Sequence, residues 1–284
     1  MKIIVIGSIN IDFVIDTIDM PANGETVFAK SYDLLPGGKG ANQAVAAARL
    51  GGDVSFYGKI GSDRLSDVAL LNFKSSGIDT MYLKKVDGNT GCATILLNDN
   101  DNRILNVPGV NNTFTKDEIN EELISKFDII LVQNEINYDV VEHIIEIGYK
   151  LGKIIIYNPA PFIKKINLEL LKKITYITPN EIEAELLFGK DYKKLMIDFP
   201  EKIIVTLGSE GVLFYKDGKY SQILPSKVDV VDTTGAGDTF NGALATYLSL
   251  GNDLPNAIMK AVVAATESVK GFGAQDAMPW KGFN

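Results

Sequence analysis

The sequence predicts an α/β protein of three layers, α/β/α, in which helices cover both faces of a mostly parallel central sheet. The first observation behind this prediction is a series of short apolar runs, rich in Ile and Val, which are typical of strands buried on both faces. The second is that segments with apolar residues at three- and four-residue intervals, the period of an amphipathic helix, lie between those runs. Strands that alternate with helices along a chain form parallel sheets with helical crossovers.

The expected elements follow from these patterns in chain order. The apolar runs predict strands at 2–6, 54–57, 128–132, 153–157, 176–178 and 202–206. The helical spacing predicts helices at 41–50, 63–75, 138–151 and 180–188. Two longer helical stretches, 236–250 and 254–270, close the chain and are separated by a Gly-Asn-Asp turn.

Two segments, at about 11–35 and 90–107, interrupt this alternation. Both have the pattern of strands broken by a turn, at 21–24 in the first and at 98–102 in the second. They flank a Gly-rich segment near residue 38, so we expect them to form a small sheet over whatever that segment binds. We interpret this sheet as a lid on a single domain that spans 1–284.

The composition is that of an ordinary globular protein, and it excludes several classes of site. The chain has 284 residues, of which 46% are hydrophobic and 23% charged, enough to bury a large core. One Cys and one His exclude an intrachain disulfide, a cysteine-ligated metal cluster and a multi-histidine zinc site. The net charge of -8 argues against broad binding to a nucleic-acid backbone.

The sequence also lacks membrane and targeting signals. It contains no run of about 18 apolar residues, so we expect no membrane-spanning helix. The apolar stretch that follows Lys2 is too short for a signal peptide, and the single Cys fits a reducing compartment. We therefore expect a cytoplasmic protein.

The string Asp-Thr-Thr-Gly-Ala-Gly-Asp at 232–238 opens the helix expected at 236–250. Small residues at Gly235, Ala236 and Gly237 let the N–H groups of a helix N-terminus approach a ligand, and the helix dipole favours an anion such as phosphate. Asp238 would face the same spot. A purely structural alternative is a Gly-rich turn with Asp238 as the N-cap.

A second constellation surrounds the start of the helix expected at 41–50. Gly38 allows close backbone approach, while Lys39 and Asn42 supply donors suited to a neutral polyol. Lys39 is followed by Gly and not by Ser or Thr, so this is no Walker A loop. Asn10 and Asp12, two apart after the first strand, share one face if the chain stays extended and could hold vicinal hydroxyls. Tight turns at both places are the structural alternatives.

Two further segments suggest a nucleotide site. Asn180 and Glu183 have capping-box spacing, which explains both residues structurally, but Glu183 is also suited to hold hydrated Mg²⁺ near phosphates. The segment 206–211 reads as a strand that ends in a turn and could contact a nucleotide.

Taken together and in this order, the motifs resemble the ribokinase-like (PfkB-type) sugar kinases, over nearly the whole chain. The strings that carry the resemblance are Gly-Ser-Ile-Asn-Ile-Asp at 7–12, Pro-Gly-Gly-Lys-Gly-Ala-Asn-Gln-Ala-Val-Ala-Ala-Ala at 36–48, Thr-Pro-Asn-Glu at 178–181, Thr-Leu-Gly-Ser-Glu-Gly at 206–211 and Asp-Thr-Thr-Gly-Ala-Gly-Asp-Thr-Phe-Asn-Gly-Ala at 232–243. The resemblance implies ATP-dependent phosphorylation of the primary hydroxyl of a sugar, with the 5-hydroxyl of D-ribose as the expected acceptor.

The resemblance also assigns roles to residues. It implies that Asp238 is the catalytic base and that Gly235, Ala236 and Gly237 form the anion hole. The residues that it implies for the sugar are Asn10, Asp12, Gly38, Lys39, Asn42 and Glu135. The residues that it implies along the nucleotide are Asn180, Thr206, Gly208, Ser209, Gly211 and Gly237.

Similarity to this family further implies Mg²⁺, an activating K⁺ and a homodimer joined through the lid. The residues matched to the K⁺ site are Asp232, Thr234, Ser268, Gly271, Gly273 and Ala277. Family members often carry a Ser at the position of Ala277, so one oxygen ligand is missing here. Two other departures are a short connection between Glu183 and the strand at 202–206 and a chain that stops four residues after Trp280.

Several alternatives stay open. The acceptor could be 2-deoxyribose, fructose or a nucleoside, although the intact Gly-Gly-Lys-Gly-Ala-Asn-Gln string favours ribose. A non-catalytic sugar-binding regulator could use the same body, because fold does not determine function. A Rossmann-type dehydrogenase would need Gly-x-Gly-x-x-Gly in the first strand-to-helix turn, and this sequence does not have it.

Overall fold

The structure, a computed structural model, describes residues 1–98 and 101–283. Its strands are β1 (Lys2–Ile6), β2 (Asn10–Thr17), β3 (Ala29–Gly37), β4 (Asp53–Gly61), β5 (Leu83–Val86), β6 (Gly91–Asn98), β7 (Asp101–Val107), β8 (Ile129–Val132), β9 (Ile154–Tyr157), β10 (Tyr176–Ile177), β11 (Ile204–Thr206), β12 (Val212–Lys216) and β13 (Lys219–Ile223). Its α-helices are α1 (Lys39–Arg49), α2 (Ser66–Ser76), α3 (Glu121–Ser125), α4 (Tyr138–Lys150), α5 (Leu168–Lys173), α6 (Glu181–Phe188), α7 (Tyr192–Asp198), α8 (Ala236–Ser249) and α9 (Leu254–Ser268). Short 3-10 helices are η1 (Gly109–Thr113), η2 (Lys116–Glu118) and η3 (Gly208–Glu210).

The central sheet has the strand order β10-β9-β8-β1-β4-β5, and every neighbouring pair is parallel. Successive side chains of a strand point to opposite faces, so each buried strand serves two cores. In β1, Ile3 and Val5 pack with α1, α2, α8 and α9, whereas Ile4 and Ile6 pack in the cluster that includes α3, α4 and α5. The structure therefore confirms the parallel sheet with helices on both faces that the continuous apolar runs predicted.

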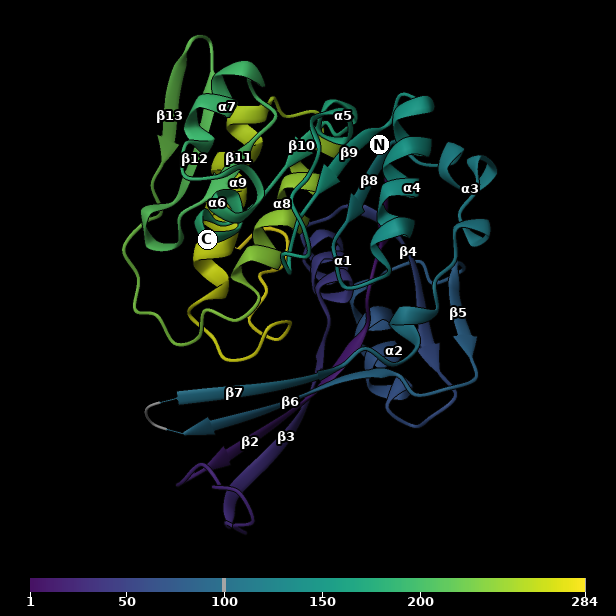
Figure 1. The fold of residues 1–284 in the computed structure, drawn as a ribbon, viewed down its shortest axis with the longest axis vertical. Helices are drawn as coiled ribbons and strands as arrows, with labels where there is room; N and C mark the ends of the chain where they lie inside the picture. The colour runs from purple at the N-terminus through teal and green to yellow at the C-terminus, as the bar shows by residue number, and fades with distance from the viewer. Residues whose placement is uncertain (99–100, 284) are drawn as a thin grey trace.

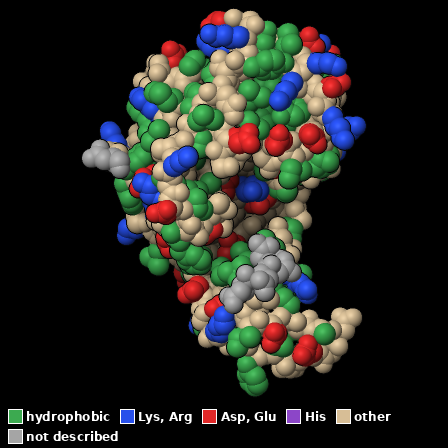
Figure 2. Space-filling view, turned by 90° about the vertical axis from the view of Figure 1, so that its left-hand side faces the viewer, with side chains coloured by type: hydrophobic (Ala, Val, Ile, Leu, Met, Phe, Trp, Pro, Cys, Tyr) green, Lys and Arg blue, Asp and Glu red, His purple; other side chains and the backbone are tan. Residues whose placement is uncertain are grey.

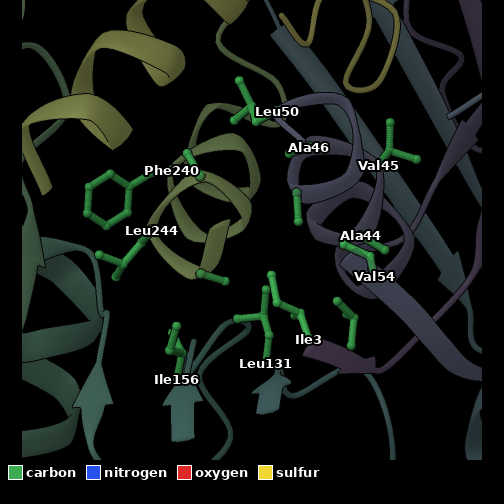
Figure 3. Close-up of a cluster of buried hydrophobic side chains, with 14 of the residues drawn as sticks. Ile3, Ala44, Val45, Ala46, Leu50, Val54, Leu131, Ile156, Phe240 and Leu244 are labelled. Atoms are coloured by element: carbon green, nitrogen blue, oxygen red, sulfur yellow. The ribbon is translucent and has the colours of Figure 1, made fainter. Parts of the chain in front are cut away.

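The core beneath α1 and α8 positions the start of both helices (Figure 3). Ile3, Leu131 and Ile156 rise from three neighbouring strands toward Phe240 and Leu244 of α8, all of them buried. On α1, small alanines let the two helices approach closely. Gly242 of α8 allows the closest contact, because a Cβ there would lie 2.5 Å from the carbonyl oxygen of Gln43. As a result, the N-terminal ends of α1 and α8 lie next to each other, near the point where β1 ends.

The segment after β10 departs from the simple alternation. The apolar run at 202–206 predicted one more buried parallel strand, and Ile203, just before β11, does form a parallel bridge with Ile177 of the central sheet. However, β11 also pairs with β12 antiparallel, and β12 pairs with β13. The β12–β13 hairpin turns at Asp217 and Gly218, whose φ angles are 51° and 77°, as a two-residue hairpin turn requires. The Asp-Gly pair is a local sequence signal for a hairpin, but no hairpin was predicted here.

The lid is the sheet β3-β2-β6-β7, which stands off the body below α2 in Figure 1. The two segments singled out in the sequence are joined by parallel pairing of β2 with β6, and each forms an antiparallel pair, β2 with β3 and β6 with β7. The prediction of one small sheet from two distant segments is confirmed. Part of the turn expected at 98–102 falls on residues 99 and 100, outside the described residues.

In the part of the chain that the structure describes, no helix combines the length and the apolar character needed to cross a membrane.

Candidate active site

Asp238 lies in the first turn of α8, next to the glycine turn. Gly235 is the N-cap residue, with a φ of 77° that favours glycine, and a Cβ at this position would lie 2.8 Å from the carbonyl oxygen of Ala274. No side chain caps the helix, so Asp238 is not the N-cap that the structural alternative proposed. The Asp238 side chain is instead buried, at 6% exposure, in the first turn of the helix, where the N–H groups have no partner within the helix.

Both oxygens of the Asp238 carboxylate accept hydrogen bonds from α1. The side-chain amide of Asn42 donates to Oδ2 and that of Gln43 donates to Oδ1, each over 2.9 Å. Asn42 was predicted to hold a sugar. The structure shows its side chain bonded to Asp238, the residue predicted to be the catalytic base. Gln43 was not predicted as a site residue, although it follows Asn42 directly in the Gly-rich string. The two amide donors hold the carboxylate at both of its oxygens.

Gln43 is itself held by two other side chains. It donates to Oδ1 of Asn158 over 3.0 Å and accepts a hydrogen bond from Gln133 over 2.6 Å. Gln133 is fully buried, and its Oε1 has no hydrogen-bond partner among the described residues. That oxygen lies where a side chain of residue 7 would go, because a Cβ on Gly7 would be 2.2 Å from it. Because Gly7 has no side chain, it leaves room for Gln133, which in turn holds Gln43.

The start of α1 brings Glu135 into the site. Gly38 precedes α1 with a φ of 89°, and a Cβ there would lie 2.6 Å from the backbone nitrogen of Asn10. The Glu135 carboxylate accepts from the backbone N–H of Lys39 over 2.9 Å and from the hydroxyl of Ser8 over 2.6 Å. Glu135 follows β8 and Ser8 follows β1, so the ends of two neighbouring parallel strands meet at α1.

Asn10 and Asp12 point from one face of β2, as the two-residue spacing predicted. Burial raises the pKa of Asp12 to about 6, with further contributions from the negative charges of Glu135 and Asp238. Asn10 is buried, and its Oδ1 accepts a hydrogen bond from Asn111 over 2.9 Å. Asn111 also bonds both polar groups of the Ile9 backbone, and no sequence pattern indicated this role.

Lys39 is the positive charge among these carboxylates. The charge of Asp238 raises the pKa of Lys39, burial opposes that rise, and Glu135 and Glu183 add to it. Lys39, Asp238 and Glu183 line a cavity of about 130 Å³, together with Asn158, Ala160, Thr178, Asn180, Thr206, Gly235, Gly237 and Asn241. Figure 2 shows a hollow where the body meets the lid, with acidic and basic side chains exposed in it.

The residues predicted along the nucleotide are only partly brought together. Asn180 and Glu183 form the reciprocal capping box of α6, with bonds of 2.8 and 2.9 Å, so the structural interpretation of this pair is confirmed. Both residues also line the cavity, as does Thr206, which bridges Asn180 in parallel. Gly208 and Ser209 are exposed in η3, and Gly211 is buried beside β13; these three are not among the lining residues of that cavity.

Glu183 suits a hydrated divalent ion better than a direct metal cage. Burial raises its pKa, its bond to the Asn180 N–H and the charge of Lys39 lower it, and Asp238 raises it. Among the described residues, no group of three or more His, Cys, Asp or Glu side chains is arranged to hold a metal ion. A single carboxylate beside a phosphate site fits Mg²⁺, which keeps most of its waters.

The residues matched to a monovalent cation site are partly brought together. Asp232 accepts from the N–H and the hydroxyl of Thr234, over 2.9 and 2.6 Å, and from the N–H of Gly273 over 3.0 Å. Partial burial raises the pKa of Asp232, but these hydrogen bonds together lower it more, so this pKa lies below its usual range. Ala277 packs against Gly271, since a Cβ on Gly271 would lie 2.9 Å from that of Ala277. The Ser268 hydroxyl is used within α9, where it donates to the carbonyl of Ala265.

Comparisons with known proteins agree with this geometry. The model of the pfkB family of carbohydrate kinases matches residues 1–281. A protein of Lactococcus lactis subsp. lactis named ribokinase is 42% identical over 283 residues, which cover 98% of this chain and 94% of the relative. A deoxyribokinase of Salmonella typhimurium is 36% identical, with 98% of this chain and 96% of the relative covered. The structure of Arabidopsis thaliana ribokinase complexed with ribose and ATP superposes with a TM-score of 0.88 at 31% identity, covering 98% of this chain and 95% of that one.

Proposed function

The chain belongs to the pfkB family of carbohydrate kinases, and from this membership we propose that it transfers the γ-phosphate of ATP to the 5-hydroxyl of D-ribose, giving D-ribose 5-phosphate. The observation that carries the proposal is the placement of Asp238, a buried carboxylate held on both oxygens and lying at the N-terminus of a helix. This position suits both substrates. The start of the helix favours the phosphate of ATP, and the carboxylate beside it can accept the proton of the sugar hydroxyl.

The reaction would proceed by positioning and charge stabilisation. The sugar hydroxyl donates its proton to Asp238 as its oxygen forms a bond to the γ-phosphorus, and ADP leaves with the electrons of the broken P–O bond. The N–H groups around Gly235, Ala236 and Gly237 face the transferred phosphoryl group, and Lys39 adds positive charge nearby. When bound with ATP, Mg²⁺ would neutralise phosphate charge, and Glu183 would hold it through water.

The acceptor sugar would lie between β2 and the start of α1. Asn10, Asp12, Asn42 and Glu135 present amides and carboxylates, the groups that bind hydroxyls, while Gly38 lets the backbone approach. Closure of the lid over this position would keep water away from the phosphoryl group and limit ATP hydrolysis. Along the nucleotide we place Asn180, Thr206 and the 206–211 turn.

We also propose K⁺ as an activator. The supporting arrangement is Asp232, whose carboxylate already joins Thr234 to the loop after α9 at Gly273, immediately before the glycine turn. A cation held by oxygen atoms there, with Ser268 and Gly271 supplying backbone carbonyls, would stiffen the turn without touching the sugar.

A homodimer joined through the lid is the proposed assembly. The strand register puts Leu34, Phe13, Thr94 and Leu105 in one row across one face of the lid. The next row on that face has Tyr32, Ile15, Leu96 and Arg103, so these two rows are apolar except for Thr94 and Arg103. Leu105 is 67% exposed and Tyr32 is 70% exposed. An apolar sheet face that stands off the body favours burial against a second copy of the chain. We further propose that the protein works in the cytoplasm.

The experiment that tests the function is a coupled ADP-release assay with D-ribose, other pentoses, hexoses and nucleosides. The proposal requires the highest kcat/KM with D-ribose and loss of turnover in Asp238→Asn. The second candidate acceptor is 2-deoxyribose, because the Salmonella relative is a deoxyribokinase. ATP binding without turnover of any sugar would instead favour the non-catalytic regulator.

A further inference from the structure

A chain of side-chain amides connects the loop after α9 to the carboxylate of Asp238. Gln275, 2% exposed, donates from Nε2 to Oδ1 of Asn42 over 2.9 Å. Asn42 donates in turn from Nδ2 to Oδ2 of Asp238 over 2.9 Å. At the other end of the chain, Asn72 of α2 donates to Oε1 of Gln275. Each amide thus accepts at its oxygen and donates at its nitrogen, and the chain ends on the carboxylate.

This direction fixes the orientation of Asn42. If the Asn42 amide turned over, its oxygen would face the carboxylate of Asp238, acceptor against acceptor. Its nitrogen would then face the nitrogen of Gln275, donor against donor. The turned amide would therefore lose both hydrogen bonds, and these groups are buried, where an unpaired polar group is costly. Gln275 and the carboxylate of Asp238 therefore fix the orientation of Asn42 together, one at each end of the amide.

Gln275 itself is held from α1. Arg49, 7% exposed, donates from Nη1 to the backbone oxygens of Gln275 and Met278 and lies 4.9 Å from the ring of Trp280. Gln275 is thus held at its main chain by Arg49 and at its side chain by Asn72 and Asn42. It lies two residues after Gly273, whose N–H bonds Asp232.

We propose that Gln275 is a positioning residue for phosphoryl transfer, acting through Asn42 to hold the Asp238 carboxylate in line with the sugar hydroxyl. The inference deepens the proposed function and rests on it, because it assumes that Asp238 accepts the hydroxyl proton. Without Gln275 to hold its oxygen, the Asn42 amide can shift, and the carboxylate is then held firmly only at Oδ1, by Gln43, and can rotate about its Cβ–Cγ bond. Small displacements of a reacting group from its productive geometry reduce rate steeply.

The test uses Gln275→Met, which is similar in length but has no amide. We expect kcat to fall about tenfold, while the Kd for ATP stays within about twofold. In an Asn42→Ala background, the same substitution should change kcat by less than about twofold, since its route to Asp238 is already cut. Asn256→Leu is the control, because Asn256 presents an exposed side-chain amide on α9 and is not among the residues that we place at the sugar or the nucleotide.

Two kinetic outcomes would overturn the proposal. One is a kcat for Gln275→Met within twofold of the parent. The other is an equal loss in the parent and in the Asn42→Ala background, which would mean that Gln275 acts on packing and not through Asn42. If Gln275→Met does not fold, Asn72→Ala removes the donor to Gln275 from the half-buried surface of α2. It should lower kcat roughly threefold in the parent and not in the Asn42→Ala background.

A readout without turnover separates this inference from the proposed function. The side-chain NH₂ signal of Asn42 in a ¹⁵N–¹H spectrum can be assigned by its loss in Asn42→Ala. It should shift in Gln275→Met and stay in place in Asn256→Leu, and an unmoved signal in Gln275→Met overturns the orientation argument. Full activity in Asp238→Asn would refute the base role and leave this spectral dependence intact.

Discussion

The side-chain amide of Gln43 in α1 donates a hydrogen bond to Oδ1 of Asp238 in α8 over 2.9 Å, across 195 positions of the sequence. This bond joins the two helices whose N-terminal ends form the site. It is also a link between the two motifs that the sequence singled out separately, the Gly-Gly-Lys-Gly-Ala-Asn-Gln string and the Gly-Ala-Gly-Asp turn.

Asp238→Asn should keep the fold and ATP binding but lose turnover. An amide cannot take the hydroxyl proton, and a well-placed general base contributes on the order of a hundred to ten thousand-fold in rate. Steady-state kcat, the melting temperature and the Kd for ATP are the measurements, with Asp217→Asn in the β12–β13 turn as control. A kcat within threefold of the parent would remove Asp238 from the base role.

Sugar affinity should depend on pH through Asp12. Its pKa of about 6 lies above the usual value, so the carboxylate holds its proton at a higher pH than in water and loses charge as the pH falls through 6. If the charged form accepts hydrogen bonds from the sugar, the Kd for D-ribose should rise about tenfold between pH 7 and pH 5. Calorimetry without ATP measures this directly.

Asp12→Asn is the control for that titration. Its affinity should be lower at pH 7, by about 1.5–3 kcal/mol if a charged hydrogen bond is lost, and flat with pH. ATP affinity should change little. A variant with the same pH dependence as the parent would assign the titration to another group.

K⁺ should activate the enzyme, and Ala277→Ser should lower the half-saturating K⁺ concentration. A hydroxyl beside Gly271 would restore one oxygen to a shell that otherwise consists of Asp232 and backbone carbonyls. Rates are compared in K⁺, Na⁺ and a bulky organic cation at matched ionic strength, because nonspecific screening acts equally in all three. Identical rates in the three salts would rule out an activating site.

Leu105→Arg should convert the proposed dimer into a monomer. Leu105 lies on the apolar face of the lid in the row of Leu34 and Phe13, whereas the neighbouring Ile104 lies on the opposite face in the row of Val14. Ile104→Arg is the matched control, since Ile104 is 59% and Leu105 is 67% exposed. Analytical ultracentrifugation reports the mass, and a dimer that survives Leu105→Arg contradicts the proposed interface.

Gly7→Ala should destabilise the fold and slow turnover together. The new Cβ would lie 2.2 Å from Oε1 of Gln133 and 2.9 Å from Cα of Gly40, so Gln133 must leave its place beside Gln43. Overpacking of this kind costs about 1–3 kcal/mol, measured by denaturant unfolding. Adding Gln133→Ala makes room for the methyl group, so the double variant should be more stable than the sum of the single effects; strict additivity would contradict the contact.

Local patterns were sufficient for much of the fold. The continuous apolar runs indicated the parallel strands, the three- and four-residue spacing indicated the helices, and the alternating segments indicated the lid. These signals work because strand and helix periods are properties of neighbouring residues. The β12–β13 hairpin was missed although its Asp-Gly turn is also local, since the apolar run before it read as one more parallel strand.

For the site, the sequence by itself determined the glycine turns, the helix starts and the polar residues beside them. Gly38 and Gly235 could be recognised because a positive φ is a local requirement that favours glycine. The tertiary structure decided which side chains meet the Asp238 carboxylate. Gln133 and Gln275 had no distinguishing pattern, and Gln43 lay in the Gly-rich string without a sign of its partners, because a buried amide is placed by partners far away in the chain and not by its neighbours.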